Sequence, residues 1–423
     1  MNILVLGSGG REHAIIKSMS KSEKSSTIYA LPGNGGTSLL AKNIAGDVND
    51  FDLIKKVVVE KNISMVFVGP EDPIVKGIYD YFKSDAELSE VKIIAPSKLA
   101  GSLEGSKDFA KDFMKKYNIP TARHKTFTAE NINQADSFLE SMSPPYVLKA
   151  DGLAAGKGVL ILHDLTEAKK ELRSMIIDKK FGESSSKVVI EEFLDGIELS
   201  CFVLTDGHSY KTLPFAKDYK KIGEGDTGLN TGGMGAISPV PFLDDNFLLK
   251  VENKIIKPTI DGIKNEKMEY IGFVFIGLIK VKEEPYVIEY NVRMGDPETE
   301  VVFPRISTDV IDLFDSLGTP KFNQLALKIN PKHAVTVILV SGGYPEEYEK
   351  EKVITGLSDV EESVIFHAGT KQEENSFITN GGRVLAVTSI SDKYQEALKL
   401  SYAQIQKLGF EKMYYRKDIG FDL

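Results

Sequence analysis

Short apolar runs alternate with amphipathic segments through the first hundred residues, and this alternation limits the possible folds more than any other feature of the chain. The runs are short and largely apolar, as buried parallel strands are: Ile3–Leu6, Thr27–Ala30, Met65–Val68 and Ile93–Ala95. Between them, apolar residues recur at helical spacing, at Phe51, Ile54, Val57 and Val58 and again at Ile74, Ile78 and Phe82. The alternation predicts an α/β fold that begins with an open, doubly wound parallel sheet.

Each of these predicted strands ends in a loop of glycine, proline or small polar residues. The loops are Gly7–Gly10, Pro32–Gly36, Gly69–Pro73 and Pro96–Ser97. Because the carboxyl ends of parallel strands meet at one edge of a sheet, we expect a ligand site at this edge.

Length and composition restrict the class of protein. A chain of 423 residues favours about three domains, and its one cysteine, Cys201, excludes disulfide frameworks and cysteine-based zinc sites. The net charge of −9 gives no support to a general polyanion-binding surface, so we expect no nucleic-acid partner. The amino terminus reaches glycine too early for a signal peptide, and the longest apolar stretch, Ile271–Ile279, is too short to span a bilayer. We therefore expect a cytoplasmic protein without a membrane partner.

The segment Gly7-Ser8-Gly9-Gly10-Arg11-Glu12-His13 follows the first predicted strand and opens a helix. It differs from a dinucleotide fingerprint, because Glu12 replaces the third glycine and no acidic residue follows the second strand. Glycines at a helix N-terminus still suit a phosphate, and Arg11 adds a charge-assisted contact. A phosphate site and a plain tight turn are equal alternatives here.

Two further segments are rich in glycine. Gly152–Gly158 is one residue short of a Walker loop and lacks its magnesium-binding hydroxyl, yet a lysine in such a loop can lie along phosphates. Lys149 stands at the mouth of this loop as a second lysine. Gly223–Gly235 holds six glycines in thirteen residues and is predicted to be a mobile functional loop, with a flexible connector as the alternative.

The pattern from residue 188 to 204 predicts a hairpin. Val188–Leu194 is a predicted strand, Asp195-Gly196 a turn, and Glu198–Leu204 the returning strand. Alternation in the second strand makes Cys201 a small core residue and not a nucleophile. The six histidines are scattered and show no spacing typical of metal ligands.

Val287–Arg293 is the most informative strand. Alternation places Glu289, Asn291 and Arg293 on one face. Two oxygen donors at this spacing suit a hard divalent cation that shares its shell with phosphates, and an arginine suits a transferred phosphoryl group. The alternative is the exposed face of an amphipathic strand, but the carboxylates from Asp296 onward favour the metal site.

An ordered set of motifs now points to a family. In chain order these are Gly7–Ala14, Pro32–Gly36, Val68–Pro73, Asn230–Gly235, Arg293–Glu298, His367–Thr370, Gly381–Val384 and Arg416–Gly420. Together they closely resemble the phosphoribosylamine–glycine ligases, a family of the ATP-grasp superfamily, and the resemblance covers essentially the whole chain. It implies an N-terminal substrate-binding α/β domain over 1–103, an ATP-grasp domain over 104–330 with a small lid at about 123–194, and a C-terminal α/β domain over 331–423.

The resemblance also implies roles for individual residues. Those implied for ATP are Lys107, Lys149, Gly156, Lys157, Gly158, Glu191, Glu192, Phe193, Leu194 and Glu198. Those implied for the other substrates are Gly9, Gly10, Arg11, Asp218, Gly232 and Gly233. Glu289 and Asn291 are implied as metal ligands, and Arg293 and Asp296 as catalytic residues. The chain departs from the family at Lys217, Tyr219, Leu229 and Met294, where glutamine, histidine, proline and phenylalanine are usual.

The implied reaction is a step of de novo purine biosynthesis. It joins glycine to 5-phosphoribosylamine through glycyl phosphate, while ATP becomes ADP and phosphate. The implied cofactors are ATP with Mg²⁺, or Mn²⁺ in its place, and the implied assembly is a monomer or weak homodimer. Two alternatives stay open: an ATP-grasp ligase that activates another carboxylate, and a dinucleotide-dependent oxidoreductase, which the broken fingerprint disfavours.

Overall fold

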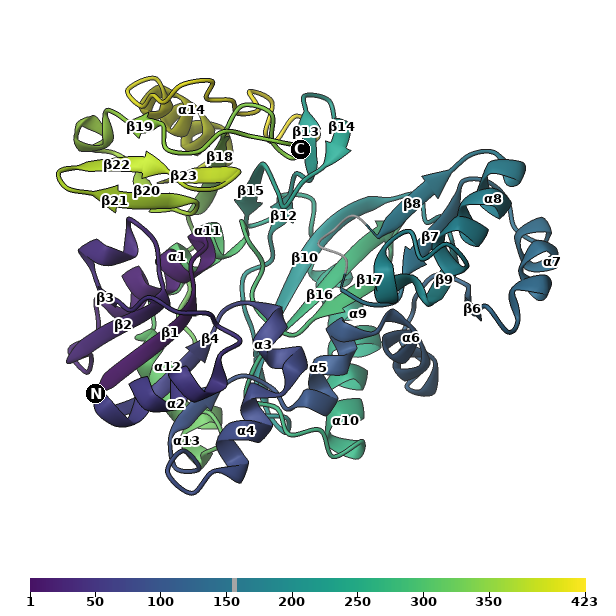
Figure 1. Cartoon of the computed structure of the whole chain (residues 1–423), viewed down its shortest axis with the longest axis horizontal. Helices are drawn as coiled ribbons and strands as arrows, with labels where there is room; N and C mark the ends of the chain where they lie inside the picture. Colours follow the sequence, from purple (N-terminus) through teal and green to yellow (C-terminus); the bar gives the residue numbers. More distant parts are fainter. Residues whose placement is uncertain (154–157) are drawn as a thin grey trace.

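A parallel five-stranded sheet forms the N-terminal part of the computed structural model, which describes residues 1–153 and 158–423 (Figure 1). The strand order is β3-β2-β1-β4-β5, and all neighbours pair in parallel. The strands are β1 (Asn2–Gly7), β2 (Thr27–Pro32), β3 (Lys42–Asn43), β4 (Ile63–Val68) and β5 (Lys92–Ile94). The predicted α/β class, with a doubly wound parallel sheet at the N-terminus, is confirmed. The loops after β1, β2 and β4 therefore share one edge of the sheet.

The helices of this part follow the predicted periodicity with one break. They are α1 (Gly10–Met19), α2 (Phe51–Glu60), α3 (Glu71–Lys76), α4 (Ile78–Ser84) and α5 (Lys98–Gly105). The apolar residues from Ile74 to Phe82 keep their helical spacing but lie on two helices. Gly77 separates these helices and has a φ of +93°. Glycine reaches this left-handed conformation without a Cβ clash, so it ends one helix and starts the next.

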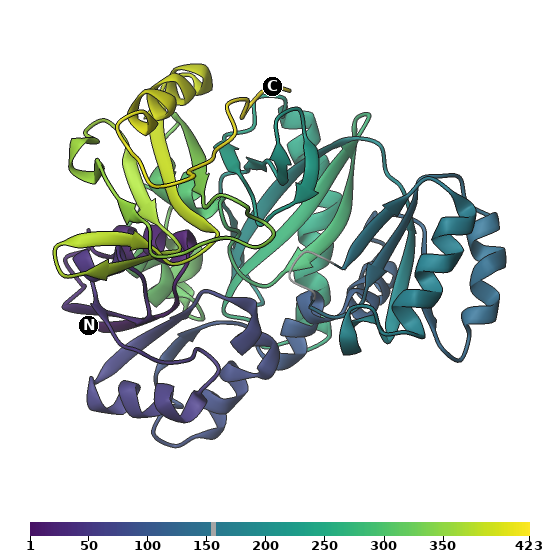
Figure 2. The ribbon, with the colours of Figure 1, turned by 45° about the horizontal axis from the view of Figure 1, so that its top comes forward.

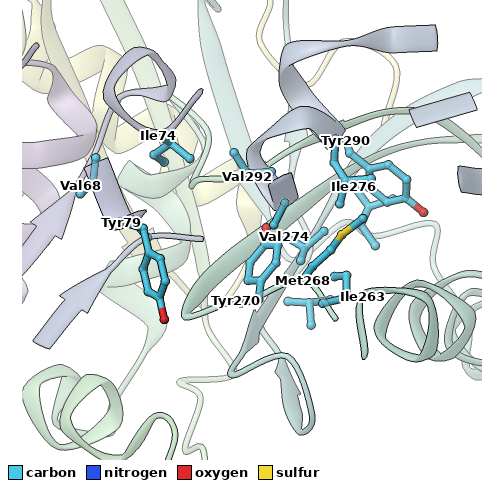
Figure 3. Close-up of a cluster of buried hydrophobic side chains, with 14 of the residues drawn as sticks. Val68, Ile74, Tyr79, Ile263, Met268, Tyr270, Val274, Ile276, Tyr290 and Val292 are labelled. Carbon is cyan, nitrogen blue, oxygen red and sulfur yellow. The ribbon is translucent and has the colours of Figure 1, made fainter. Parts of the chain in front are cut away.

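The central sheet is antiparallel, in the order β11-β10-β16-β17. Its strands are β10 (Ile197–Thr205), β11 (Tyr210–Thr212), β16 (Gly272–Val281) and β17 (Glu284–Asn291), and α6 (Lys107–Lys116), α9 (Asp245–Val251) and α10 (Lys257–Asn265) lie beside it. Figure 3 shows Tyr290 in β17 and Val292 just after it, in the same core as Val68 and Ile74. That packing leaves Glu289, Asn291 and Arg293 on the opposite face, as predicted.

A second four-stranded sheet, β6-β9-β7-β8, stands apart at the right of Figure 1 and is covered by two helices. Its elements are β6 (His124–Thr128), α7 (Ala135–Glu140), β7 (Tyr146–Ala150), β8 (Val159–Leu162), α8 (Leu165–Ile176) and β9 (Lys187–Glu192). The predicted hairpin between residues 188 and 204 is wrong. β9 pairs with β6 and β7, whereas β10 pairs with β11 and β16, so residues 193–196 carry the chain from one sheet to the next.

The remaining strands form a sheet that draws on two distant parts of the chain, in the order β12-β15-β18-β23-β20. Its strands are β12 (Lys217–Asp218), β15 (Gly235–Ser238), β18 (His333–Val340), β20 (Val364–His367) and β23 (Arg383–Ser391), with α14 (Tyr394–Ile405) packed on it. A small sheet of β19 (Val353–Ile354), β22 (Ser376–Thr379) and β21 (Thr370–Glu373) lies over the N-terminal strands (Figure 2). Helices α11 (Thr299–Val302), α12 (Val310–Ser316) and α13 (Pro320–Gln324) return to pack on the N-terminal sheet.

Cys201 and the apolar segments can now be placed in the fold. Cys201 is fully buried among apolar side chains, and burial raises the pKa of its thiol, which fits a core residue. Within the described ranges, no helix is long and apolar enough to span a bilayer.

Candidate active site

A cavity of about 430 Å³ lies between the N-terminal sheet edge and the C-terminal sheets. Ser8, Gly9 and Asn34 line it from the N-terminal side, and Thr370 and Arg383 from the C-terminal side. The loops after β1 and β2 therefore meet there, as the parallel sheet predicts.

The N-terminus of α1 already holds carboxylates. Glu12 Oε2 accepts a hydrogen bond from Gly9 N at 2.6 Å, and Asp296 Oδ2 accepts one from Arg11 N at 3.3 Å. A Cβ at Gly7 or Gly69 would lie within 2.6 or 2.0 Å of the Glu12 side chain. Glu12 stands at the position of the third glycine of a dinucleotide fingerprint. Its side chain fills the space beside Gly7 and Gly69 that a glycine at this position would leave open.

The Arg11 side chain points into the protein. Its Nε lies 2.5 Å from Glu12 Oε1 and its Nη1 donates to Met294 O at 3.2 Å. The arginine that lines the cavity is Arg383, which the sequence marked only as part of the motif Gly381–Val384. Arg383 Nη2 lies 3.0 Å from Asp296 Oδ1.

Asp296, predicted as catalytic, lines the cavity beside a second buried carboxyl group. Burial raises the pKa of Glu300 well above its usual range, and the neighbouring Asp296 adds to this. The pKa of Asp296 is lowered overall, because Arg383 and Arg11 outweigh its burial. The surroundings therefore favour the protonated form of Glu300 and the ionised form of Asp296. A Cβ at Gly10 would come within 2.2 Å of Glu300, so a larger residue there would displace the Glu300 carboxyl group.

Gly232 and Gly233 support the cavity from behind Arg383. Gly232 O accepts from Arg383 Nη1 at 2.5 Å, and Gly232 N donates to the hydroxyl of Tyr344 at 2.9 Å. Gly233 has a φ of +116°, and a Cβ there would lie 2.4 Å from Pro297. Close packing accounts for both glycines.

The hairpin β13 (Lys221–Gly223) and β14 (Thr227–Asn230) has fixed contacts, which the composition of Gly223–Gly235 did not predict. The fully buried Arg416 donates to Asp226 Oδ1 at 2.6 Å and to Lys221 O at 3.2 Å, and Asp418 accepts from Gly225 N at 2.7 Å. These partners lie about two hundred residues away in sequence, so the local composition did not indicate them, and the mobility of the loop stays a prediction.

Arg293 is held by two carboxylates of the N-terminal part. Its Nε lies 3.2 Å from Glu71 Oε2, and its Nη2 donates to Glu104 Oε1 at 2.8 Å. Nη2 also donates to Asn291 Oδ1 at 3.1 Å, so the predicted catalytic arginine and a predicted metal ligand are in contact. Sequence reasoning missed Glu104, which follows no recognisable motif, and used Glu71 only as part of Val68–Pro73.

Buried lysines surround Glu191 on the side of the second sheet. Glu191 lies 3.1 Å from Lys149 Nζ and 2.9 Å from Lys111 Nζ, and all three side chains are buried. Burial alone would raise the pKa of Glu191, but the two lysines lower it. Lys107 lies at the start of α6, where burial lowers its pKa and Glu289 partly offsets this. Lys111 was not predicted, because it sits within an ordinary amphipathic helix.

The residues after Glu191 follow the crossing between sheets. Glu192 Oε1 accepts from Arg123 N at 2.7 Å, and Glu192 and Phe193 line a hollow of about 580 Å³. Phe193 is exposed, and Leu194 leads toward β10. Gly158 O accepts from Ala150 N at 2.8 Å. Gly156 and Lys157, predicted to bind phosphates, lie outside the described residues.

A charged cluster forms where β10 and β12 meet. Lys220 Nζ lies 2.8 Å from Glu198 Oε2 and 4.0 Å from Asp218 Oδ2. Burial raises the pKa of Asp218, and Glu198 adds to it against the Lys220 charge. Burial likewise raises the pKa of Glu298 to about 7, with Asp218 as the next cause. Lys220 and Glu298 were not among the predicted site residues.

Glu289 and Asn291, the predicted metal ligands, suit a cation that also binds oxygen atoms from other molecules. Among residues 1–153 and 158–423, no group of three His, Cys, Asp or Glu side chains could hold a metal ion alone. Glu289 and Asn291 offer a carboxylate and an amide oxygen on one strand face, which suits a divalent ion completed by phosphate oxygens. The negative charge of Glu289 favours the charged forms of Lys107, Lys111 and Lys220. Their ammonium groups suit the same phosphates.

Three domain models of one known family match most of the chain. Residues 1–104, 105–299 and 334–422 match the N domain, the ATP-grasp (A) domain and the C domain of phosphoribosylglycinamide synthetase. A phosphoribosylamine–glycine ligase of Caldanaerobacter subterraneus is 43% identical over 420 residues, 99% of either chain. A bifunctional purine biosynthetic protein of Pichia angusta is 41% identical over 99% of this chain and 53% of its own length.

Solved structures support the same family and fold. The phosphoribosylamine–glycine ligase of Thermotoga maritima superposes with a TM-score of 0.84 at 34% identity, covering 99% of this chain and 100% of that one. The biotin carboxylase domain of Hydrogenobacter thermophilus 2-oxoglutarate carboxylase, solved with MgADP, has a TM-score of 0.72 at 14% identity, with 98% and 91% covered, and shares the fold alone. On these matches, the chain belongs to the phosphoribosylamine–glycine ligase family of ATP-grasp enzymes.

Proposed function

We propose that this protein joins glycine to 5-phosphoribosylamine, with ATP going to ADP and phosphate, as a step of de novo purine biosynthesis. One observation carries the proposal: the segment from Glu289 to Asp296 connects the lysine-lined side of the molecule to the cavity at the N-terminal sheet edge. The Glu289 charge acts on Lys107 and Lys111 in the first region, and Asp296 lines the second. Asn291 and Arg293 lie between them in sequence and share a hydrogen bond. A single short segment can therefore bring a phosphoryl donor and an amine acceptor together.

ATP is assigned to the lysine-lined side. Lys107 and Lys149 hold its phosphates, Glu191 fixes Lys149, and the crossing at Glu192–Leu194 is proposed for the adenine and Glu198 for the ribose. Glu289 and Asn291 would hold a divalent ion, Mg²⁺ or Mn²⁺ in its place, which would draw charge from the phosphate oxygens.

The ribosyl phosphate is assigned to the cavity beside Gly9 and Gly10. Gly9 N and Arg11 N already donate to carboxylates, and the Arg11 guanidinium group is bound to Glu12 and Met294 O. We therefore assign the main phosphate contact to Arg383, which lines the cavity. Asp218 and the buried Glu298 are proposed to hold the ammonium group of glycine: burial raises the pKa of both carboxyl groups, and the charge of Asp218 raises that of Glu298 further.

The chemistry then needs positioning and charge neutralisation more than a covalent nucleophile. A glycine carboxylate oxygen attacks the γ-phosphorus, the bond from that phosphorus to ADP breaks, and glycyl phosphate forms. The amine of phosphoribosylamine attacks the acyl carbon, phosphate leaves, and the amine proton passes to solvent or to an ionised carboxylate. Arg293, fixed by Glu71 and Glu104, stabilises the migrating phosphoryl group.

Other features of the protein are proposed on the same basis. They are a division at about residues 103 and 330, a cytoplasmic location, and a monomer or weak homodimer. An ATP-grasp ligase for another carboxylate would share the lysines and the metal strand but would not need Arg383 at a phosphate cavity.

The test is ADP formation measured with glycine and phosphoribosylamine, separately and together. We expect steady turnover only with both, and one ADP per amide. Arg383→Met should raise the KM for phosphoribosylamine about tenfold or more and leave the KM for ATP unchanged, since it removes a charge-assisted phosphate contact. Arg173→Met, which removes an exposed arginine paired with Asp136, is the matched control. Turnover with glycine but no need for phosphoribosylamine would contradict the proposal.

A further inference from the structure

Asp422 contacts Lys217 in β12 and Tyr219 directly after this strand. Its Oδ2 lies 3.1 Å from Lys217 Nζ, and its Oδ1 accepts a hydrogen bond from the Tyr219 hydroxyl at 2.9 Å, 203 residues away in sequence. Lys217 and Tyr219 are two residues apart and flank Asp218 in the sequence. Asp422 thus holds the two residues that flank Asp218.

Both of these residues are buried. Lys217 is 5% exposed and Tyr219 is 1% exposed. The Lys217 ammonium lies 4.8 Å from the centre of the Tyr219 ring. Across residues 1–153 and 158–423, Asp422 is the carboxylate within ion-pair distance of Lys217, and the structure records no second one.

Removing the Asp422 charge would leave a buried ammonium group without its partner, which is strongly unfavourable. The ammonium would then turn to another carboxylate, and Asp218 is adjacent in the chain. The two groups already interact: burial raises the pKa of Asp218, and the charges of Lys220 and Lys217 lower it. A Lys217–Asp218 pair would occupy the carboxylate assigned to the glycine ammonium group.

We infer that Asp422 is a positioning residue for glycine binding: it holds the Lys217 ammonium away from Asp218 and leaves that carboxylate for the substrate amine. The inference rests on the proposed function, because it requires glycine as the substrate at Asp218. It gives a role to the part of the chain around residue 422, which contacts neither the cavity nor the lysines of the nucleotide side in the described residues.

The experiment is a double-mutant cycle in the full chain, with Asp422→Asn, Lys217→Gln and both together. The KM for glycine, the KM for ATP, the turnover number and the melting temperature are measured for each. Asp422→Asn should raise the KM for glycine about tenfold and leave the KM for ATP within about twofold. In the Lys217→Gln background the same change should leave the KM for glycine unchanged within about twofold, since no ammonium remains to move.

Asp392→Asn is the matched control, because Asp392 is an exposed carboxylate that pairs with Lys332 at 3.4 Å. An equal rise in the KM for glycine in both backgrounds, a parallel rise for ATP, or an unchanged Asp422→Asn variant would overturn the inference. If Asp422→Asn does not fold, the double variant decides: it should fold and match Lys217→Gln, and its failure to fold would show a purely structural role. A wild-type protein without glycine-dependent ADP formation would overturn the proposed function itself, before any variant is compared.

Discussion

Arg293 Nη2 donates to Glu104 Oε1 over 2.8 Å, and the other oxygen of the same carboxylate accepts from Val292 N, also over 2.8 Å. One buried side chain on α5 thus fixes both the guanidinium group and the backbone that carries it. Arg293 Nη1 and Arg11 Nη1 also donate to the same carbonyl oxygen, that of Met294, at 3.3 and 3.2 Å. The end of β17 is therefore positioned by the N-terminal part of the protein, where the amine substrate is assigned.

We predict that Glu104→Gln lowers turnover about a hundredfold at pH 8, because Arg293 loses the charge that orients it. The pH profile should change as well. Burial raises the pKa of Glu104 to about 7, so the wild-type carboxylate is ionised above this pH and holds Arg293, and protonation below it weakens the pair. Wild-type turnover should thus fall as the pH drops through about 7, and the variant should lack this limb.

The control for this prediction is Glu90→Gln, the same change at an exposed glutamate. Steady-state rates from pH 6 to 9 distinguish the two variants. A Glu104→Gln enzyme with the wild-type rate and pH profile would show that Arg293 needs no such support.

We predict that Glu289→Gln folds normally but loses most of its metal-dependent turnover, since it removes the anionic oxygen ligand. Titration of Mg²⁺ should show a shift of the half-saturating concentration by about tenfold or more. Glu283→Gln, in the exposed turn before β17, serves as the control and should titrate like the wild type. A normal titration of the Glu289 variant would remove Glu289 from the metal site.

The local pattern was sufficient for much of the fold. The parallel strands of the N-terminal sheet follow from their short apolar runs. The face that carries Glu289, Asn291 and Arg293 follows from alternation, because neighbouring Tyr290 and Val292 belong to the core. The predicted hairpin at residues 188–204 is wrong because its local pattern does not specify the pairing partner. Two β-rich runs around Asp-Gly have the same pattern whether they pair with each other or with distant strands.

The supporting residues of the site could not be predicted from spacing. Lys111 and Glu104 lie on helices where charged residues usually face solvent, and only the tertiary fold brings them to Glu191 and Arg293. Arg11 was expected at a phosphate because it follows a glycine-rich turn. Its neighbour Glu12 binds the guanidinium group instead, a contact that depends on the packing of both side chains.

A different prediction concerns two buried histidines at the contact between α1 and β20. His367 N donates to His13 Nδ1 at 2.8 Å, and burial lowers the pKa of His13 to about 3 and that of His367 to about 4. Between the ordinary histidine pKa of about 6.5 and these values, the unfolded chain binds protons that the folded protein does not. The free energy of unfolding should therefore fall as the pH drops from about 6.5 toward 4.

His13→Asn keeps an acceptor for His367 N but cannot be protonated. It should reduce the slope of the free energy of unfolding against pH by about 1.4 kcal/mol per pH unit below pH 6.5. Denaturant titrations at pH 7, 6 and 5 give this slope, with the exposed His208→Asn as the control. Equal slopes for the wild type and the His13 variant would contradict the prediction.

The last prediction concerns which phosphorus atom is attacked. Arg293 and Asn291 share a hydrogen bond at the end of β17, and the Glu289 charge acts on Lys107, Lys111 and Lys220, so charge is concentrated where a terminal phosphoryl group would move. We therefore expect ADP and phosphate as products, with glycyl phosphate between the two half-reactions. In glycine labelled with ¹⁸O in its carboxylate, one labelled oxygen becomes the bridge to phosphorus and leaves with phosphate when the amine attacks. Mass spectrometry should find one ¹⁸O in each inorganic phosphate and none in the nucleotide. Label in AMP would mean attack at the α-phosphorus, and the roles given to Arg293 and Glu289 would then be wrong.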